Sequence, residues 1–369
     1  MSVDSNEIDK ILAEPDEVIH AAIENIVEAA NEILESGPPY LFITLENPYY
    51  IAGDNICGQV LLDLPKRLKK GTLNLSCQGC EEVHVFHQNV PVSQYTNKIF
   101  SLNSELKSWR RLKEGGYIVP FQFKLPQHCP PSFYFSGSNE ENFYLKAQIS
   151  YTMVAKFTYR KMQEELIHSK VLNIRSIECR NNPKVEAETM EFVHGFCCSS
   201  SKGSSVFKLV HTADEHPMAN GPISFKLVPD NGNCSVPINQ VVAEITMELE
   251  LVGRERNYML NQTIKSIPRI TWIAAYTSLV FEKDFEFSSD LKIAGEDLNV
   301  SSISTQYIKC RYAVKVHVHY DMGLKKVPAC VGMNIHVNPS IPIEKHKNTL
   351  PTDWTGESEP VIKLVPENI

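Results

Sequence analysis

The sequence has no long hydrophobic run, and this absence excludes the usual helical membrane anchor. Hydrophobic residues make up 43% of its 369 positions. No apolar stretch approaches the roughly 20 residues that a membrane-spanning helix needs. The first residues, MSVDSNEIDK, lack the basic and apolar regions of a secretory signal. We therefore expect a cytoplasmic protein without a membrane span.

Cysteine is scarce, and the common catalytic motifs are missing. Ten cysteines in a chain of this length are too few for a disulfide scaffold, and in a reducing compartment most act as small apolar residues. The sequence contains no P-loop, G-x-G-x-x-G, H-E-x-x-H or Ser-His-Asp arrangement. We therefore expect that the protein is not an enzyme and that it has no cofactor and no small-molecule substrate.

Two pairs of residues keep a metal- or thiol-dependent enzyme open as an alternative. Cys77 and Cys80 form a C-x-x-C pair, and His317 and His319 fall on one face of a predicted strand. A structural zinc needs four ligands, and the sequence has no second C-x-x-C. We therefore interpret both pairs, and the adjacent Cys197 and Cys198, as structural residues with no metal bound.

Basic residues are scarce at the N-terminus, where most of the charge imbalance lies. Residues 1–37 hold one lysine and ten acidic residues, which gives 1 − 10 = −9, against −8 for the whole chain. The remaining residues sum to +1, so no broad basic field attracts nucleic acid. We expect no nucleic-acid partner.

Helical periodicity is confined to the acidic N-terminus. The spacing predicts an amphipathic helix within residues 1–38, with Pro15 in its first turn and Gly37 at its end. Its acidic polar face argues against binding anionic lipid. The apolar face either packs on the protein's own domains or binds a partner, and comprises Ile19, Ile23, Ile26, Val27, Ile33 and Leu34.

After Tyr40 the pattern changes to short runs with alternating hydrophobicity, which predicts an all-β protein. Its length favours two domains. We predict an N-terminal helix over 1–38, a β-sandwich over 39–182, a linker over 183–204, a second β-sandwich over 205–340 and an extended or disordered tail over 341–369. In the run GGYIVPFQFKLPQHCPPSFYF (115–135), alternation puts four side chains on one buried strand face: Val119, Phe121, Phe123 and Leu125.

Several of these runs resemble the arrestin family, most closely its α-arrestin, or arrestin domain-containing, branch. The opening resembles the family in its Gly53-Asp54 turn and in the G-x-V-x-L strand formed by Gly58, Val60 and Leu62. Residues 115–135 resemble the family's aromatic and proline signature, and this is the most specific match: Gly116, Tyr117, Pro120, Phe121, Phe123, Leu125, Pro126, Pro131, Ser132 and Phe133.

The second half resembles the family more loosely. It departs from the Gly-Glu turn expected before its second strand, where it reads Asn220, Gly221 and Pro222. The arrestin-fold subunit of retromer is a more distant relative on the same fold. The resemblance therefore implies two tandem arrestin-like, immunoglobulin-like sandwiches over roughly residues 40–340.

The family resemblance also implies a function. An arrestin-like chain is expected to be a non-enzymatic adaptor or scaffold that binds cytoplasmic regions of membrane proteins and trafficking machinery in protein transport, endocytosis or signalling. The alternative is a constitutive subunit of a retromer-like sorting or coat complex. The expected location is cytoplasmic, with peripheral contact at the plasma membrane or endosomes.

Two local basic clusters are the candidate contacts for phosphate or an anionic membrane. Each lies in a predicted turn, where a solvated loop is the simpler interpretation. Near a membrane surface, each Lys or Arg contributes about 1 kcal/mol. The clusters comprise Lys66, Arg67, Lys69 and Lys70 in the first, and Lys107, Arg110, Arg111 and Lys113 in the second.

Overall fold

The computed structural model describes residues 39–159, 165–176, 186–194, 200–278, 285–292, 299–322, 328–340 and 356–368. Every regular element within these ranges is a β-strand, which confirms the all-β prediction. No helix in these ranges is long and apolar enough to cross a membrane. The helix predicted over 1–38 lies outside the described residues.

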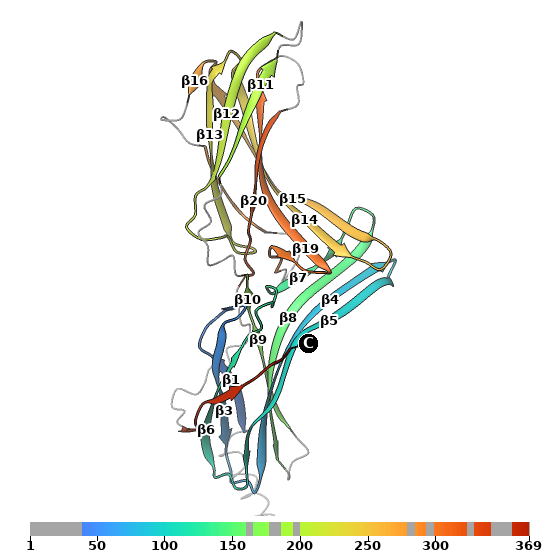
Figure 1. Ribbon diagram of the computed structural model, residues 1–369, viewed down its shortest axis with the longest axis vertical. Coiled ribbons are helices and arrows are strands. Elements are labelled where there is room, and N and C mark those ends of the chain that lie inside the picture. The colour runs from blue at the N-terminus through green and yellow to red at the C-terminus, as the bar shows by residue number, and fades with distance from the viewer. Residues whose placement is uncertain are drawn as a thin grey trace, which may run out of the picture.

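The first domain packs two antiparallel sheets face to face (Figure 1). One sheet has the order β1-β3-β6, formed by β1 (Tyr40–Leu45), β3 (Asn55–Leu64) and β6 (Gly115–Lys124). The other has the order β5-β4-β8, with β7 and β9 both pairing with β8; its strands are β4 (Gly71–His87), β5 (Val90–Trp109), β7 (Phe133–Ser138), β8 (Phe143–Tyr159) and β9 (Leu166–Leu172). The short strands β2 (Tyr50–Ile51) and β10 (Ile174–Arg175) pair in parallel.

The strand face predicted in residues 115–135 is confirmed. Val119, Phe121 and Phe123 on β6 are at most 2% exposed, and Leu125 just after the strand is 1% exposed. Burying each large apolar side chain favours folding by about 1.5 to 3 kcal/mol. The Gly53-Asp54 turn forms as well, because Gly53 has φ of 84° and the Asp54 carboxylate accepts a hydrogen bond of 2.9 Å from the Ile51 amide.

The second domain repeats the two-sheet arrangement. One sheet has the order β11-β12-β13, with β16 and β17 on β13; its strands are β11 (Glu186–His194), β12 (Ser201–His211), β13 (Pro222–Cys234), β16 (Thr277–Ser278) and β17 (Phe285–Asp290). The other has the order β15-β14-β19, with β18 and β20 on β19; its strands are β14 (Ile238–Val252), β15 (Asn257–Ile273), β18 (Ile303–Ser304), β19 (Ile308–Tyr320) and β20 (Ala329–Ile335). Two tandem arrestin-like sandwiches are therefore present.

The linker predicted over 183–204 requires correction, because most of its described residues are strand. Residues 186–194 form β11, which pairs antiparallel with β12 from Glu186 opposite Val210 onward. Met190 and Phe192 on this strand are 55% and 62% exposed. The strand was missed because only Val193 is buried on it, so its sequence shows no buried face.

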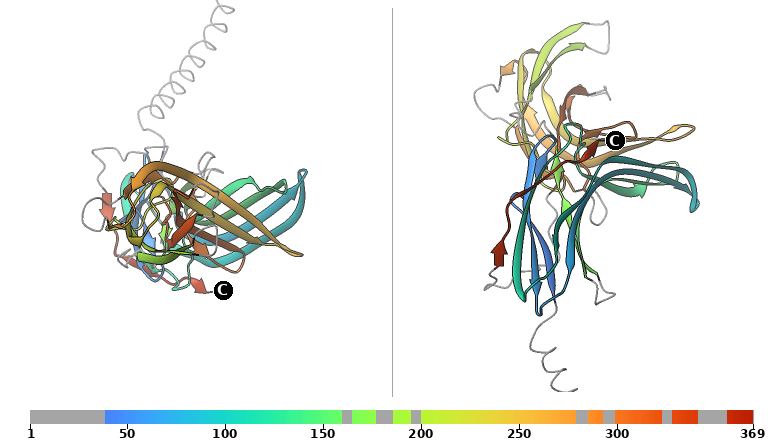
Figure 2. Two further views of the ribbon diagram at one scale, coloured as in Figure 1. Left: turned by 90° about the horizontal axis from the view of Figure 1, so that it is seen from above. Right: turned by 60° about the horizontal axis from the view of Figure 1, so that its bottom comes forward.

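The two domains meet through individual side-chain contacts, several of them along a lateral wing. In Figures 1 and 2, the ends of β4, β5 and β8 extend beside β14, β15 and β19. At the wing, the Phe143 and Tyr258 rings lie 5.1 Å apart. The guanidinium of Arg256 lies 4.6 Å from the centre of the Phe143 ring and 2.8 Å from the Glu141 carboxylate. Closer to the molecular axis, Tyr95 and Tyr307 stack at 5.0 Å.

The end of the chain returns to the first domain. β21 (Gly356–Ser358) and β22 (Ile362–Leu364) both pair in parallel with β6, and β23 (Glu367–Asn368) pairs with β5. Leu364 is 8% exposed and joins the hydrophobic core. The free edge of β6 is therefore covered by a segment that follows the whole second domain in the sequence.

Candidate functional site

The structure brings the two predicted basic clusters together at one end of the first domain. Leu68 in the β3–β4 loop and Leu112 in the β5–β6 loop form an isolated antiparallel bridge. Each backbone amide donates to the other residue's carbonyl at 3.0 Å. The cationic side chains of both loops therefore share one surface, the basic tip: Lys66, Arg67, Lys69, Lys70, Arg110, Arg111 and Lys113.

An apolar base holds the two loops of the basic tip in place. Leu112 is fully buried, and the ring of Trp109 packs edge-on against Tyr117 at 5.8 Å and Phe157 at 6.3 Å. The Tyr117 hydroxyl accepts a hydrogen bond from the Lys113 amide at 2.8 Å. At Gly71, an added Cβ would come within 2.5 Å of the Phe157 ring. Both loops therefore rest on close-packed core that orders their backbones.

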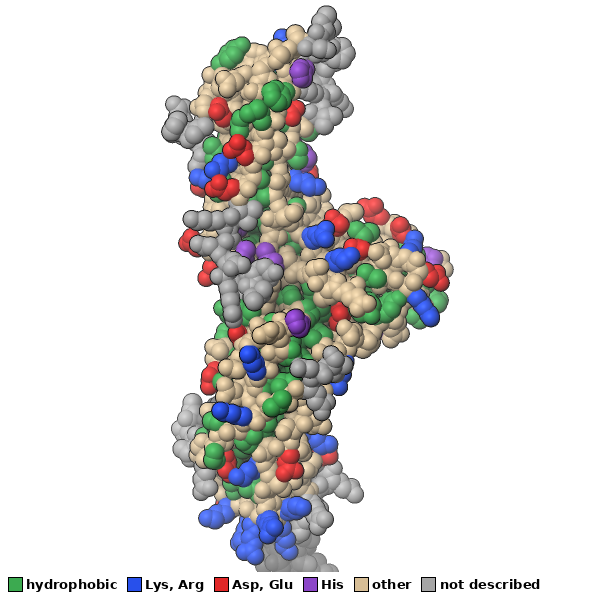
Figure 3. All heavy atoms as spheres, viewed as in Figure 1, with side chains coloured by type: hydrophobic (Ala, Val, Ile, Leu, Met, Phe, Trp, Pro, Cys, Tyr) green, Lys and Arg blue, Asp and Glu red, His purple; other side chains and the backbone are tan. Residues whose placement is uncertain are grey.

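The charged groups of the basic tip face solvent. All seven are exposed, and Figure 3 shows a concentration of Lys and Arg side chains at this end of the molecule. Within the described residues, none of the seven forms an ion pair. The one acidic residue in these two loops is the exposed Glu114. This arrangement attracts anions, since it lacks compensating carboxylates of its own.

Lys107, the eighth predicted basic residue, has a different role. It is partly buried, and its ammonium forms an ion pair of 2.8 Å with the Glu359 carboxylate, just after β21. Lys107 therefore helps to hold the C-terminal strands, and its charge is already matched.

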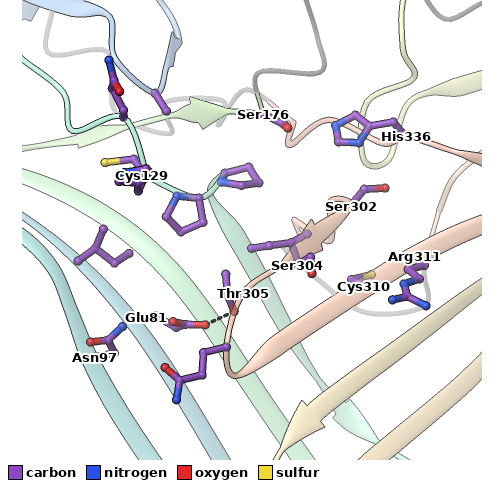
Figure 4. A pocket seen from close by; sticks show the side chains of 18 of the residues that line it. Glu81, Asn97, Cys129, Ser176, Ser302, Ser304, Thr305, Cys310, Arg311 and His336 are labelled. Atoms are coloured by element: carbon purple, nitrogen blue, oxygen red, sulfur yellow. Dashed lines mark hydrogen bonds between the residues drawn. The ribbon is translucent and has the colours of Figure 1, made fainter.

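A second candidate site is a cleft between the two domains, with a volume of about 880 Å³. Figure 4 shows side chains from both domains facing it. Its lining is largely polar and includes Glu81, Asn97 and Lys98 from the first domain and Thr305, Gln306 and Arg311 from the second. A cleft of this size with mixed polar groups suits a peptide segment better than an apolar ligand.

Glu81 connects the two domains inside this cleft. It is 4% exposed, and its carboxylate accepts a hydrogen bond from the Thr305 hydroxyl. The same hydroxyl accepts a hydrogen bond of 2.9 Å from the Ile308 amide. This bond fixes the loop before β19. Sequence reasoning missed this contact, although a glutamate at an inward position of the alternating strand β4 is an available signal.

The structure separates the residues of the alternative metal or thiol site. Cys77 is buried on β4 in the first domain, and Cys80 points to the opposite face of that strand. His317 lies on β19 in the second domain, 3.4 Å from the Glu244 carboxylate. In the described ranges, no three His, Cys, Asp or Glu side chains gather as a metal-binding set. Cys197 and Cys198 lie outside those ranges.

The buried cysteines are poor nucleophiles, which gives a direct chemical prediction. Burial raises the pKa of Cys129 to about 12, and burial first, then nearby Cys129, raises the pKa of Cys77 well above its usual range. We expect iodoacetamide at pH 8 to alkylate Cys129 and Cys77 at least about 10-fold more slowly than the exposed Cys330, whose own pKa is also raised by burial, because the thiolate is the reactive form. Peptide mass spectrometry over time measures the rates. Equal rates at Cys77 and Cys330 would contradict this arrangement.

Comparison with known families gives one match. Residues 42–164 match the model of the arrestin (or S-antigen) N-terminal domain. This range runs from within β1 to just beyond β8 and includes both loops of the basic tip. A search of curated proteins gave no match.

Proposed function

Because this chain is an arrestin-family protein with its arrestin N-terminal domain at residues 42–164, we propose that it is a non-enzymatic adaptor for cytoplasmic segments of membrane proteins in trafficking or signalling. An arrestin domain supports an adaptor or scaffold role in general, in a family that is typically cytosolic and generally non-enzymatic. The α-arrestin branch is part of the proposal.

The interdomain cleft supports this proposal. It offers exposed polar and charged groups from two domains, and the Glu81–Thr305 hydrogen bond joins the two domains within it. A partner segment in the cleft would contact both domains at once, so its binding would depend on their relative position. The strand edges beside the cleft offer main-chain groups that an extended peptide can pair with.

The basic tip supplies a second proposed contact, with anionic lipid headgroups. Its seven exposed cations lie on two neighbouring loops at the end of the molecule, so they can reach a flat surface together. A membrane-bound orientation would leave the cleft free for cargo. The N-terminal helix and its apolar face stay a prediction from the sequence.

Proximity labelling in the native cell tests the adaptor proposal. We expect labelled membrane proteins to be enriched with the natural chain and lost with the cleft variant Lys98→Glu/Arg311→Glu. The matched control Lys265→Glu/Lys315→Glu reverses two exposed charges on the second domain outside the cleft lining and should keep the natural pattern. Equal labelling by all three chains would overturn the role of the cleft.

The same cells distinguish the adaptor from a coat subunit. A recruited adaptor is expected to run mostly as a free protein when native extracts are separated by size. A stable, stoichiometric assembly of fixed size would instead favour the retromer-like alternative.

A further inference from the structure

We infer that the basic tip binds the acidic N-terminal segment, residues 1–37, of the same chain. This inference goes beyond the proposed function, because it assigns an intramolecular occupant to the tip that does not depend on any membrane or cargo. It rests on the charges of the two partners and on where the chain enters the first domain.

The charges of the two partners are complementary. Residues 1–37 contain ten acidic residues and one lysine. The basic tip presents seven exposed cations, with Glu114 as the one acidic residue in its two loops. Outside residues 1–37 the positive and negative charges of the chain nearly balance, so the net negative charge of the chain lies in this segment.

The chain enters the first domain beside the basic tip. Tyr40, the first residue of β1, lies opposite Asp63 on β3. Asp63 precedes Lys66, the first cation of the tip, by three residues. Glu35 precedes Tyr40 by five residues, and five residues span at most about 18 Å when extended. Glu35 therefore lies within about 18 Å of Tyr40, so the chain is long enough for it to reach the tip.

Tethering makes this contact effective. Each exposed ion pair contributes little by itself, but a short linker holds its two ends at an effective concentration in the millimolar range. Many weak pairs formed at that concentration give a populated complex. Exposed charges are screened over about 10 Å at 0.1 M salt, so the contact should weaken as salt is raised.

Zero-length cross-linking of the full-length protein tests the inference directly. A carbodiimide joins a lysine amine to a carboxylate in contact with it, and peptide mass spectrometry identifies the pair. We expect residues 1–37 to be linked to Lys66, Lys69, Lys70 and Lys113, and these links to fall at least fivefold in 1 M NaCl. Lys265 and Lys315, exposed on the second domain, are the internal controls and should give few links.

Each outcome of the cross-linking experiment either overturns or supports the inference. Links spread evenly over all exposed lysines, or no links from residues 1–37 to the tip, would overturn the inference. Mixing isotope-labelled and unlabelled protein shows whether links join two chains, and a majority of links between chains would also overturn it. A loss of the links formed within one chain by the other carboxylates of residues 1–37, in a variant with Glu28→Gln, Glu32→Gln and Glu35→Gln, would support it.

Vesicle binding separates this inference from the proposed membrane contact. We expect the same Glu-to-Gln variant to bind phosphatidylserine vesicles several-fold more tightly than the natural chain, since fewer carboxylates compete for the tip. Cross-links without any vesicle binding would overturn the membrane contact and leave the intramolecular contact standing. Vesicle binding without cross-links would overturn the intramolecular contact and leave the membrane contact standing.

Discussion

Replacing Phe157 with alanine is expected to destabilise the first domain by about 3 to 5 kcal/mol, the usual cost of removing a buried aromatic ring. Phe157 is fully buried, and its ring contacts Trp109 and Tyr159 at centroid distances of 6.3 and 5.5 Å. It also fills the space that the missing side chain of Gly71 leaves open. The cavity left by alanine would weaken the apolar packing that supports the two loops of the basic tip.

Denaturant unfolding measures this effect. The matched control is Phe192→Ala on β11, where the ring is 62% exposed and the expected change is within about 0.5 kcal/mol. A similar small change at Phe157 would show that the ring is not in the core. Phe157→Leu should recover part of the loss, because it restores apolar volume.

Removing four charges from the basic tip is expected to abolish most binding to anionic membranes. The variant is Lys66→Gln/Arg67→Gln/Lys69→Gln/Lys70→Gln. At about 1 kcal/mol for each basic residue near the surface, the loss is about 4 kcal/mol, which corresponds to a roughly 1000-fold lower affinity. All four side chains are exposed, so the fold should be unaffected.

Co-sedimentation with phosphatidylserine vesicles measures the affinity. The control neutralises four exposed cations of the second domain: Lys202, Arg254, Lys265 and Lys315. It should bind nearly as the natural chain does. Equal losses in both variants would show that net charge, not the tip, sets the affinity. Neutral vesicles should bind neither variant nor the natural chain. Soluble inorganic phosphate should compete with the vesicles for the basic tip only if the tip recognises single phosphate groups.

Much of the fold could be predicted from alternation, and the failures have a physical reason. Residues 143–159 alternate along their whole length and form the single strand β8, because its inward residues are apolar throughout. The first half of β5 gives little such signal, because it lies in the wing and most of its residues are exposed. In β4 the pairing with β5 shifts register between Gly79 and Cys80, which interrupts the regular pattern of one long strand.

The candidate site could be predicted only in parts. The residues of both basic clusters were identified from the sequence, because runs of Lys and Arg are visible there. That the two clusters share one surface could not be predicted, because the bridge between Leu68 and Leu112 joins loops more than forty residues apart in the sequence. The cleft was invisible for the same reason: Glu81 and Thr305 meet only after both domains have folded and docked.

The return of the C-terminal strands has a consequence for synthesis on the ribosome. β6 ends at Lys124, but the strands that cover its edge begin at Gly356. The first domain must therefore emerge with that edge unpaired and wait while the whole second domain is translated. An open edge recruits other strands, so nascent chains on neighbouring ribosomes would be vulnerable to mispairing during this interval. A chaperone that masks strand edges would benefit this protein most before residues 356–364 are translated.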